Sequence, residues 1–372
     1  MNLLLTCGGT AGHINPAVAI AKLFQARRKD TNILFVGAHG GMENQLVPKE
    51  GYAIEIVHIT NFRRSLSRQS IAYNLHTLRN LRQSQKEARA ILEEFRPDLV
   101  VGTGGYASFP IVREAARRGV PTAIHESNAI PGLTTRVLSK VANVVMTGFE
   151  TEQTGYAHPE RVVVTGTPVR PEFFRYTRQE ARAALGITDE RPLLLSYWGS
   201  LGADVMNGYM TDFMAKACRQ GAPFRHIHGA ARSYDSMKTA LAAQGIELSG
   251  YSGVELCRYI YDMPTVMAAA DVVFCRAGAS TLSELMALGK PSVLVPSPNV
   301  TANHQTKNAK VLADLGGAIL LPERDCSTDR LWRLAKELLG NHETRKAMSK
   351  ATLSAAPADA AEVIYQTLSA LI

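Results

Sequence analysis

The sequence predicts an α/β protein made of two successive Rossmann-like, doubly wound domains. Three observations predict this class: short apolar runs alternate with helical segments, glycine clusters follow several of those runs, and the pattern restarts after residue 166. The chain has 372 residues, too many for one compact core. We therefore expect a first domain over 1–166 and a second over 167–355.

Apolar runs in the first domain predict short strands, and the segments between them have helical spacing. The strands are expected at 2–6, 32–36, 54–59, 98–101, 121–124, 144–147 and 162–164. Helices are expected at 16–28, 70–95 and 110–118. The first helix is expected to begin at Pro16, because proline suits the first helical turn. The opening of the chain is thus a βαβ unit.

The second domain repeats this alternation. Strands are expected at 192–197, 225–228, 256–259, 271–275 and 291–295. The C-terminal helix, 356–372, could pack back on the first domain. Both tryptophans, Trp198 and Trp332, are expected to pack in a core rather than stack on a ligand.

The stretch 274–308 organises the chain. It reads as strand, glycine turn, helix and strand, with a cap at Ser280 or Thr281, Ser283 and Glu284 in the first turn, and Gly289 at the end of the helix. Helix-start amides favour negative charge. Glu284 could accept hydrogen bonds from a sugar diol. This pattern predicts a nucleotide site.

Several motifs admit two interpretations. Three glycine loops, 8–12, 102–105 and 199–202, follow strands, but none fits the dinucleotide or Walker pattern. His13 at a helix start suits a general base, or it merely caps or packs. Arg276 is a phosphate partner or a member of a salt bridge. Gln305 and Asn308 would share one helix face.

Composition describes an ordinary globular chain. It is 46% hydrophobic and 20% charged, with mean hydropathy −0.06. The apolar runs are too short for a membrane span or a signal peptide. Five scattered cysteines without ligand-like spacing indicate a reducing cytoplasm, buried small side chains and no zinc site.

Charge is concentrated in one stretch. The net charge is +8, and residues 60–90 carry seven Lys and Arg with a single acid, Glu87. This stretch could meet an anionic membrane surface or a phosphorylated substrate, or it is a solvated helix face. No nucleic-acid-binding motif accompanies it, so nucleic acid is not expected as a partner.

Six motifs resemble one family closely, in order and over nearly the whole chain. They are GGTAGHINPAVAIA, GTGGYASFP, HESNAIPGLTTR, VTGTPVR, GSLGA and the long block from DMPTVMAAADVVF to NHQTKNA. This set resembles the MurG family, the undecaprenyl-diphospho-muramoylpentapeptide N-acetylglucosaminyltransferases of peptidoglycan synthesis. The resemblance implies a GT-B fold with a deep cleft between the domains. It implies UDP-N-acetylglucosamine (UDP-GlcNAc) as donor, lipid I as acceptor, and neither a cofactor nor a metal ion.

The resemblance also implies roles for individual residues. His13 would be the catalytic base. The acceptor's diphosphate would bind to Gly9, Thr10, Gly104, Gly105 and Tyr106. The donor would bind through Thr10, Ala11, Gly12, Asn128, Arg170, Ser200, Ile260, Ala279, Ser280, Thr281, Glu284 and Gln305. Ile260 would meet the uracil through its backbone, and Glu284 would hold the ribose hydroxyls.

The lipid-linked acceptor implies a peripheral protein at the cytoplasmic face of the membrane. The chain departs from the family's usual pattern at Ala11, Ser127, Thr167 and Trp198. A tryptophan at 198 must point away from the diphosphate. Two alternatives stay open: another UDP-sugar enzyme of this fold, such as a glycolipid glycosyltransferase or a UDP-GlcNAc 2-epimerase, and a non-catalytic scaffold for cell-wall assembly.

Overall fold

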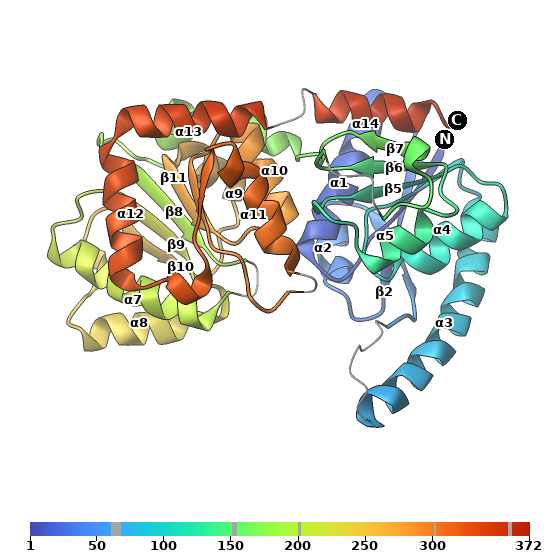
Figure 1. The fold of residues 1–372 in the computed structure, drawn as a ribbon, viewed down its shortest axis with the longest axis horizontal. Coiled ribbons are helices and arrows are strands. Elements are labelled where there is room, and N and C mark those ends of the chain that lie inside the picture. Colours follow the sequence, from blue (N-terminus) through green and yellow to red (C-terminus); the bar gives the residue numbers. More distant parts are fainter. Residues whose placement is uncertain (61–67, 151–154, 200–201, 301–302, 356–358) are drawn as a thin grey trace. The chain divides into compact units, whose positions relative to one another are not determined.

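The computed structural model describes residues 1–60, 68–150, 155–199, 202–300, 303–355 and 359–372, with the side chains of 68–76 and 78 left out. The chain divides into two compact units, each an α/β layer structure (Figure 1). Unit 1 is Met1–Arg170 with Pro357–Ile372, and unit 2 is Pro171–Ala356. The first unit thus runs past the expected limit at 166 and includes the C-terminal helix.

Unit 1 is built on a parallel sheet with the strand order β3-β2-β1-β4-β5-β6-β7. Its strands are β1 (Asn2–Thr6), β2 (Asn32–Ala38), β3 (Ala53–Val57), β4 (Leu99–Gly102), β5 (Thr122–Glu126), β6 (Val144–Thr147) and β7 (Val162–Val164). Its helices are α1 (Ala11–Arg27), α2 (Glu43–Lys49), α3 (Arg68–Phe95), α4 (Ser108–Arg117), α5 (Leu133–Leu138) and α14 (Ala360–Ser369).

Strand β1 shows why both faces of this sheet are apolar. Leu3 and Leu5 enter one core with Phe24 of α1 and Leu368 of α14. Leu4 points the opposite way, into a second core with residues of α3 and α4. Successive side chains of a strand alternate between faces, so a sheet covered on both sides reads as a continuous apolar run.

Helix α14 belongs to the first of these cores. Its Tyr365 ring lies 5.2 Å from the Phe24 ring, and Glu362 pairs with Arg27 at 2.6 Å. The end of the chain therefore packs on α1.

Unit 2 repeats the topology, with a parallel sheet of order β10-β9-β8-β11-β12-β13. Its strands are β8 (Leu193–Tyr197), β9 (Arg225–Gly229), β10 (Val254–Cys257), β11 (Val272–Cys275), β12 (Ser292–Leu294) and β13 (Ala318–Leu320). Its helices are α6 (Arg178–Ala184), α7 (Asp204–Arg219), α8 (Tyr234–Ala243), α9 (Met263–Ala269), α10 (Ala279–Leu288), α11 (His304–Asp314), α12 (Thr328–Gly340) and α13 (His342–Ser354).

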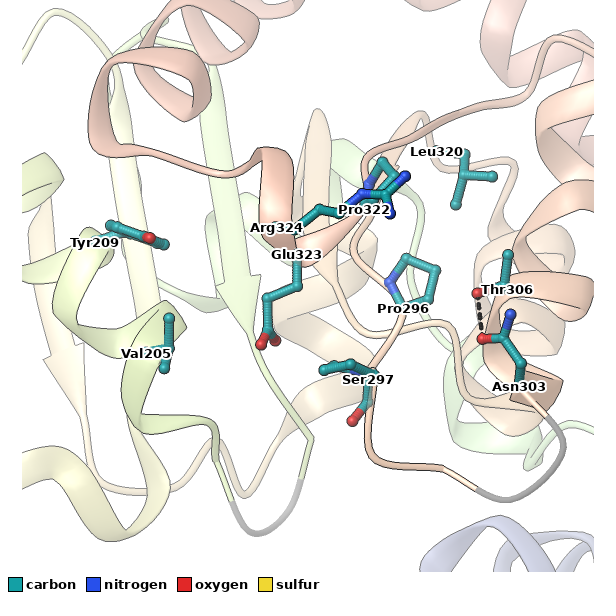
Figure 2. Close-up of a pocket in the computed structure, with 11 residues that line it drawn as sticks. Val205, Tyr209, Pro296, Ser297, Asn303, Thr306, Leu320, Pro322, Glu323 and Arg324 are labelled. Carbon is teal, nitrogen blue, oxygen red and sulfur yellow. Dashed lines mark hydrogen bonds between the residues drawn. The ribbon is translucent and has the colours of Figure 1, made fainter.

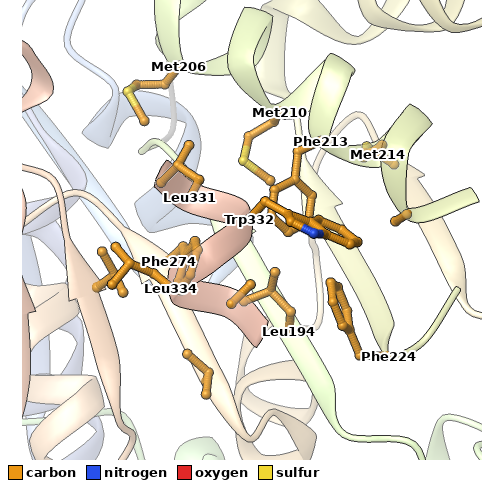
Figure 3. Packing of buried hydrophobic residues seen from close by; sticks show 14 of the residues in the cluster. Leu194, Met206, Met210, Phe213, Met214, Phe224, Phe274, Leu331, Trp332 and Leu334 are labelled. Atoms are coloured by element: carbon orange, nitrogen blue, oxygen red, sulfur yellow. The ribbon is translucent and has the colours of Figure 1, made fainter. Parts of the chain in front are cut away.

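One core of unit 2 lies where α7 and α12 pack on the sheet (Figure 3). The Phe213 and Trp332 rings meet edge to face, with centroids 5.0 Å apart. Trp332 and Trp198 are both buried, so the expectation that the tryptophans pack in a core is confirmed. Four of the five cysteines are buried as well.

Several expected boundaries were wrong. Helix α1 begins at Ala11, not Pro16, because Thr10 is extended and its carbonyl already accepts from His13 and Ile14. Pro16 lies inside the helix, where it has no N–H to donate. Strands β3 and β10 each end two residues earlier than expected. By contrast, Gly289 ends α10 in the left-handed conformation, as predicted.

Each sheet reverses its winding direction at one place, between β1 and β4 in unit 1 and between β8 and β11 in unit 2. Ligands of open α/β sheets bind at such switch points, outside the carboxyl ends of the strands. The loops after these four strands are therefore the places to look for a site. No helix in the described parts of the chain is long and apolar enough to cross a lipid bilayer.

A buried lysine holds the end of α9. The Nζ of Lys290 donates to the carbonyls of Ala268 and Ala270 at 2.7 and 2.8 Å. Burial lowers the pKa of Lys290 from its ordinary 10.5 to about 8. This lysine therefore satisfies carbonyls that a helix end would otherwise leave unpaired.

We expect Lys290→Met to lower the free energy of unfolding by about 2 kcal/mol, because two buried carbonyls lose their donor. Since the unfolded chain holds the Lys290 proton up to a higher pH, the wild type should gain stability relative to the variant as pH rises from 8 to 10.5. Urea unfolding of both proteins at several pH values measures this. The exposed Lys346→Met is the control, and a pH-independent difference would contradict the prediction.

Candidate functional site

The first glycine loop joins β1 to α1 and places a histidine at the helix start. Gly9 is left-handed, with φ +86°, which turns the chain sharply after the strand. Thr10 is the N-cap residue, and Ala11, Gly12 and His13 are the first three residues of α1. The amides of this turn therefore lie at the switch point of unit 1.

The hydrogen bond of the His13 ring fixes its tautomer. The Nδ1 atom lies 2.8 Å from the Gly8 carbonyl oxygen, and Thr10 Oγ1 lies 3.5 Å from the same nitrogen. A carbonyl oxygen only accepts, so Nδ1 carries the hydrogen. In the neutral ring, Nε2 then has the free lone pair, which is the state that a general base requires.

The second glycine loop, after β4, packs directly on the first. A Cβ on Gly104 would come within 2.6 Å of the His13 ring, and one on Gly105 within 2.3 Å of the Gly8 carbonyl. Both glycines have positive φ, +107° and +80°. Tyr106 borders Gly9. The structure thus brings together the residues expected at the acceptor side, and glycine is required where the two backbones meet.

Glu43, which the sequence did not indicate, holds the first loop by a hydrogen bond to its backbone. It is fully buried, and its carboxylate accepts from the Gly9 N–H at 3.1 Å and the Ala38 N–H at 2.8 Å. A Cβ on either Gly37 or Gly41 would overlap its side chain. The sequence gives little indication of this role, because the amides that Glu43 binds, those of Gly9 and Ala38, come from separate loops.

Asn128 lies in the loop after β5 and is held by Glu126. The carboxylate of Glu126 accepts from the Asn128 backbone and side-chain amides at 3.0 and 2.9 Å, and from Gly132 and Thr135. Arg170 pairs with Glu50 at 3.7 Å and is the last residue of unit 1 before Pro171. The expected boundary at 166, which put Arg170 in the second domain, was therefore wrong.

His125, next to Glu126, is buried at the end of β5. Its Nε2 lies 2.9 Å from the Gly166 carbonyl oxygen, which ties the strand to the segment after β7. Burial lowers the pKa of His125. A neutral ring that bonds to a carbonyl serves to hold the loop rather than to transfer protons at the surface.

In unit 2, the turn after β11 leads into α10. Gly278 is the N-cap residue, and Ala279, Ser280 and Thr281 are the first three helical residues. The expected cap at Ser280 or Thr281 was therefore wrong. Glycine at this position leaves the first amides of α10 directed at the switch point without a competing side-chain oxygen.

Glu284 lies in the second turn of α10 rather than the first, and it is buried. Ile260 follows β10 and packs against Gly229. On α11, Gln305 Oε1 accepts from the Ser297 N–H at 2.8 Å, and Asn308 donates to the Ala277 carbonyl at 3.3 Å. The shared face of Gln305 and Asn308 thus fastens the loops after β12 and β11. Ser200 lies outside the described residues.

Arg276 is a member of a salt bridge. Its guanidinium pairs with Glu323 and donates to the carbonyls of Val295 and Pro296 at 3.1 and 3.3 Å. It is buried and lies over the Trp198 ring. These bonds fix the turn before α10 to the loop after β12 and to Glu323. Arg276 therefore has a structural role in positioning this turn.

A pocket of about 500 Å³ adjoins this turn (Figure 2). Val205 and Tyr209 of α7 line one side, and Pro296, Ser297 and Glu323 line the other. Among the described residues, those expected to bind the donor do not line it. It shares Ser297 with the contact that positions Gln305.

Comparisons with known proteins agree over the whole chain. Residues 3–147 match the Glycosyltransferase family 28 N-terminal domain, and residues 197–364 match the Glycosyltransferase family 28 C-terminal domain. A crystal structure of MurG from Acinetobacter baumannii is similar, with TM-score 0.74, 25% identity and 99% of each chain covered. A UDP-GlcNAc 2-epimerase from Neisseria meningitidis shares the fold, with TM-score 0.66 and 14% identity over 100% of each chain.

The two parallel-sheet units and the two matched domains define a glycosyltransferase with the GT-B fold. Two curated relatives are UDP-N-acetylglucosamine--N-acetylmuramyl-(pentapeptide) pyrophosphoryl-undecaprenol N-acetylglucosamine transferases. The one from Thermoanaerobacter sp. (strain X514) is 39% identical over 100% of both chains. The one from Acetivibrio thermocellus is 38% identical over 99% of this chain and 97% of its own. The chain belongs to the MurG family.

The close contact of Gly105 with Gly8 predicts that a side chain at position 105 destabilises the protein. Gly105→Ala should lower the free energy of unfolding by about 1 kcal/mol for the positive φ and by about a further 1–3 kcal/mol for the overlap. Gly119→Ala is the matched control, because its φ is +74° and nothing lies within 4 Å of its Cβ position. Equal losses in urea unfolding of the two variants would contradict the close contact.

Proposed function

We propose that this chain transfers N-acetylglucosamine from UDP-GlcNAc to the C4 hydroxyl of the muramoyl-pentapeptide of lipid I, giving lipid II. The observation that carries this proposal is the identity of 39% to a relative of that activity over the full length of both chains. The likeness to the epimerase structure is at 14% identity and concerns the fold alone.

Unit 2 is the proposed donor side. The amides at the start of α10, at Ala279, Ser280 and Thr281, suit the diphosphate, because a helix N-terminus favours negative charge. Glu284 is assigned to the ribose hydroxyls and the Ile260 backbone to the uracil. Gln305 keeps its amide N–H groups for the sugar while its oxygen accepts from Ser297. Ser200, and Arg170 from the end of unit 1, are assigned to the phosphate and nucleotide side.

Unit 1 is the proposed acceptor side. The loops at Gly9, Thr10, Gly104, Gly105 and Tyr106 lie at the switch point, and their backbone amides, except the Gly9 N–H that donates to Glu43, suit the diphosphate of lipid I. Asn128, with its amide held by Glu126, is assigned to the transferred sugar. Thr10, Ala11 and Gly12, at the start of α1, are assigned to the donor as well.

The proposed chemistry is a single displacement with inversion. The acceptor's hydroxyl oxygen forms a bond to the anomeric carbon, its proton passes to His13 Nε2, and the bond to UDP breaks with its electron pair. Charge then develops on the departing diphosphate, where fixed amides stabilise it; one such donor contributes about 3 kcal/mol to lowering the barrier in comparable sites. If a His13→Ala variant kept full turnover, His13 would not be the base.

Membrane attachment is proposed through the basic face of α3. Arg79, Arg82, Lys86 and Arg89 are exposed and spaced three and four apart, so they share one side of the helix. Each such side chain contributes about 1 kcal/mol near an anionic leaflet. Arg63 and Arg64 lie outside the described residues. This face is assigned to the anionic inner leaflet, on the cytoplasmic side of the membrane.

Co-sedimentation with phosphatidylglycerol vesicles tests this attachment. We expect the wild type to bind at low salt, and the double variant Arg82→Glu, Lys86→Glu to bind at least tenfold more weakly, since two attractive charges become repulsive. Binding to neutral phosphatidylcholine vesicles is the control. Equal binding of both proteins to anionic vesicles would exclude the α3 face.

The activity is tested by incubating the protein with radiolabelled UDP-GlcNAc and lipid I and separating the lipid products. Label in lipid II supports the proposal. Label only in an epimerised sugar nucleotide would indicate an epimerase, and no conversion by the folded protein would favour a scaffold.

Glu284→Ala should weaken UDP-GlcNAc binding about 10- to 100-fold, the cost of losing charged hydrogen bonds, and leave lipid I binding unchanged. Calorimetry with each ligand measures the two affinities. Glu343→Ala, at an exposed carboxylate of α13, is the control within unit 2. An equal loss for both ligands would contradict the division between the units.

A further inference from the structure

One peptide group links a buried carboxylate to the histidine ring. The N–H of Gly9 donates to Glu43 at 3.1 Å, and the carbonyl of Gly8 accepts from His13 Nδ1 at 2.8 Å. These two groups are the ends of the same peptide bond. Glu43, the Gly8–Gly9 peptide and His13 therefore form one hydrogen-bonded chain.

The direction of each bond in this chain is fixed by chemistry. A carboxylate facing a backbone N–H accepts, and a carbonyl facing a ring nitrogen accepts. Because the peptide is conjugated, an acceptor on its N–H draws negative charge toward its carbonyl oxygen, and neighbouring hydrogen bonds strengthen one another. The chain thus favours hydrogen on Nδ1 and leaves Nε2 with the lone pair.

The fold leaves Glu43 little choice of position. Its side chain is fully buried at the start of α2, and its second oxygen accepts from Ala38 at the end of β2 at 2.8 Å. Glycine is present wherever a Cβ would collide with it, at Gly37 and Gly41, and a Cβ on Gly8 would come within 3.0 Å of its Oε1. The neighbouring Cys7 thiol has its pKa raised by burial and next by this carboxylate.

We propose that Glu43 is a positioning residue for the catalytic base, acting through the Gly8–Gly9 peptide. It holds the peptide in the orientation that gives Gly9 its positive φ, and it sets the His13 tautomer. During transfer the acceptor's proton stops on Nε2, and the Nδ1 hydrogen stays on the ring, bonded to the polarised carbonyl. This inference rests on the proposed function of His13, and it gives a peptide the orienting role that a carboxylate has in serine hydrolases.

The test is Glu43→Gln in the full chain. An amide has one acceptor oxygen, so either Gly9 or Ala38 loses its partner. Long-range ¹H–¹⁵N spectra of histidine-labelled protein, with the His13 signals assigned by their absence from His13→Ala, report which ring nitrogen carries hydrogen. We expect Nδ1–H in the wild type and a mixture of tautomers in the variant.

The kinetic expectation follows from the lost orientation. The kcat of Glu43→Gln should fall about 10- to 100-fold, as for partners that orient histidine ligands, while KM for UDP-GlcNAc stays within about twofold because the contacts assigned to the uracil, the ribose and the diphosphate, at Ile260, Glu284 and the start of α10, lie in unit 2. Glu114→Gln is the control: it removes another buried carboxylate of unit 1, one that binds Arg117 and Arg118 and makes no described bond to the loop. It should leave the His13 tautomer unchanged.

Three outcomes of Glu43→Gln decide the proposal. A shifted tautomer with reduced kcat supports it, and a shifted tautomer with wild-type kcat overturns the role in catalysis. An unchanged tautomer overturns it even where kcat falls, because Glu43 would then be structural only. Glu43→Asp serves where the glutamine variant fails to fold: its side chain is one methylene shorter and does not span Gly9 and Ala38 together, so a mixture of tautomers is again expected and an unchanged tautomer again overturns the proposal. Full turnover of His13→Ala would end the base assignment instead, and the tautomer would still decide the role of Glu43.

Discussion

The backbone of the Gly8 turn lies against the backbone of Gly105, and this contact determines the shape of unit 1 at its switch point. The two loops leave adjacent strands, β1 and β4, which pair in register from Leu3 with Leu99 to Thr6 with Gly102. Side chains at 104 or 105 would separate the loops. With both glycines present, the His13 ring lies against the second loop and the backbones of the two loops stay in contact. The placement of His13 and of the Gly8–Gly9 peptide follows from this closeness.

The two units reach a similar result with different supports. In unit 1 a buried carboxylate accepts from the glycine loop, and a histidine bonds to the carbonyl of the same peptide. In unit 2 a buried arginine, Arg276, donates to carbonyls after β12 and pairs with Glu323, while Asn308 holds the Ala277 carbonyl. In unit 1 a carboxylate satisfies loop amides, and in unit 2 a cation satisfies loop carbonyls. In both units the supporting charge is buried beneath the loop that it holds.

The sequence predicted the positions of the loops and every strand except β13, because apolar runs and glycines are local signals. Helix starts were less predictable. Pro16 suggested a first turn, but the extended Thr10 begins the helix five residues earlier. The N-cap of α10 was expected at Ser280 or Thr281 but is Gly278. The sequence rule favours serine and threonine as caps, and it does not take into account the turn before the helix. Glu43 and the salt bridge of Arg276 depend on partners from distant loops, so no local pattern could reveal them.

Trp198 shows how a departure from the family pattern can be accommodated behind a site. The ring is buried beside the core of α7 and α12, and the Arg276 guanidinium lies 6.0 Å from its centre. The added volume therefore points into unit 2, as the sequence required of a tryptophan after β8. A cation over an indole face is stabilised by about 1–2 kcal/mol when it is desolvated. The same guanidinium pairs with Glu323 and donates to the carbonyls after β12. Trp198 therefore helps to hold Arg276 in place before α10. A glycine at position 198 would not make this contact.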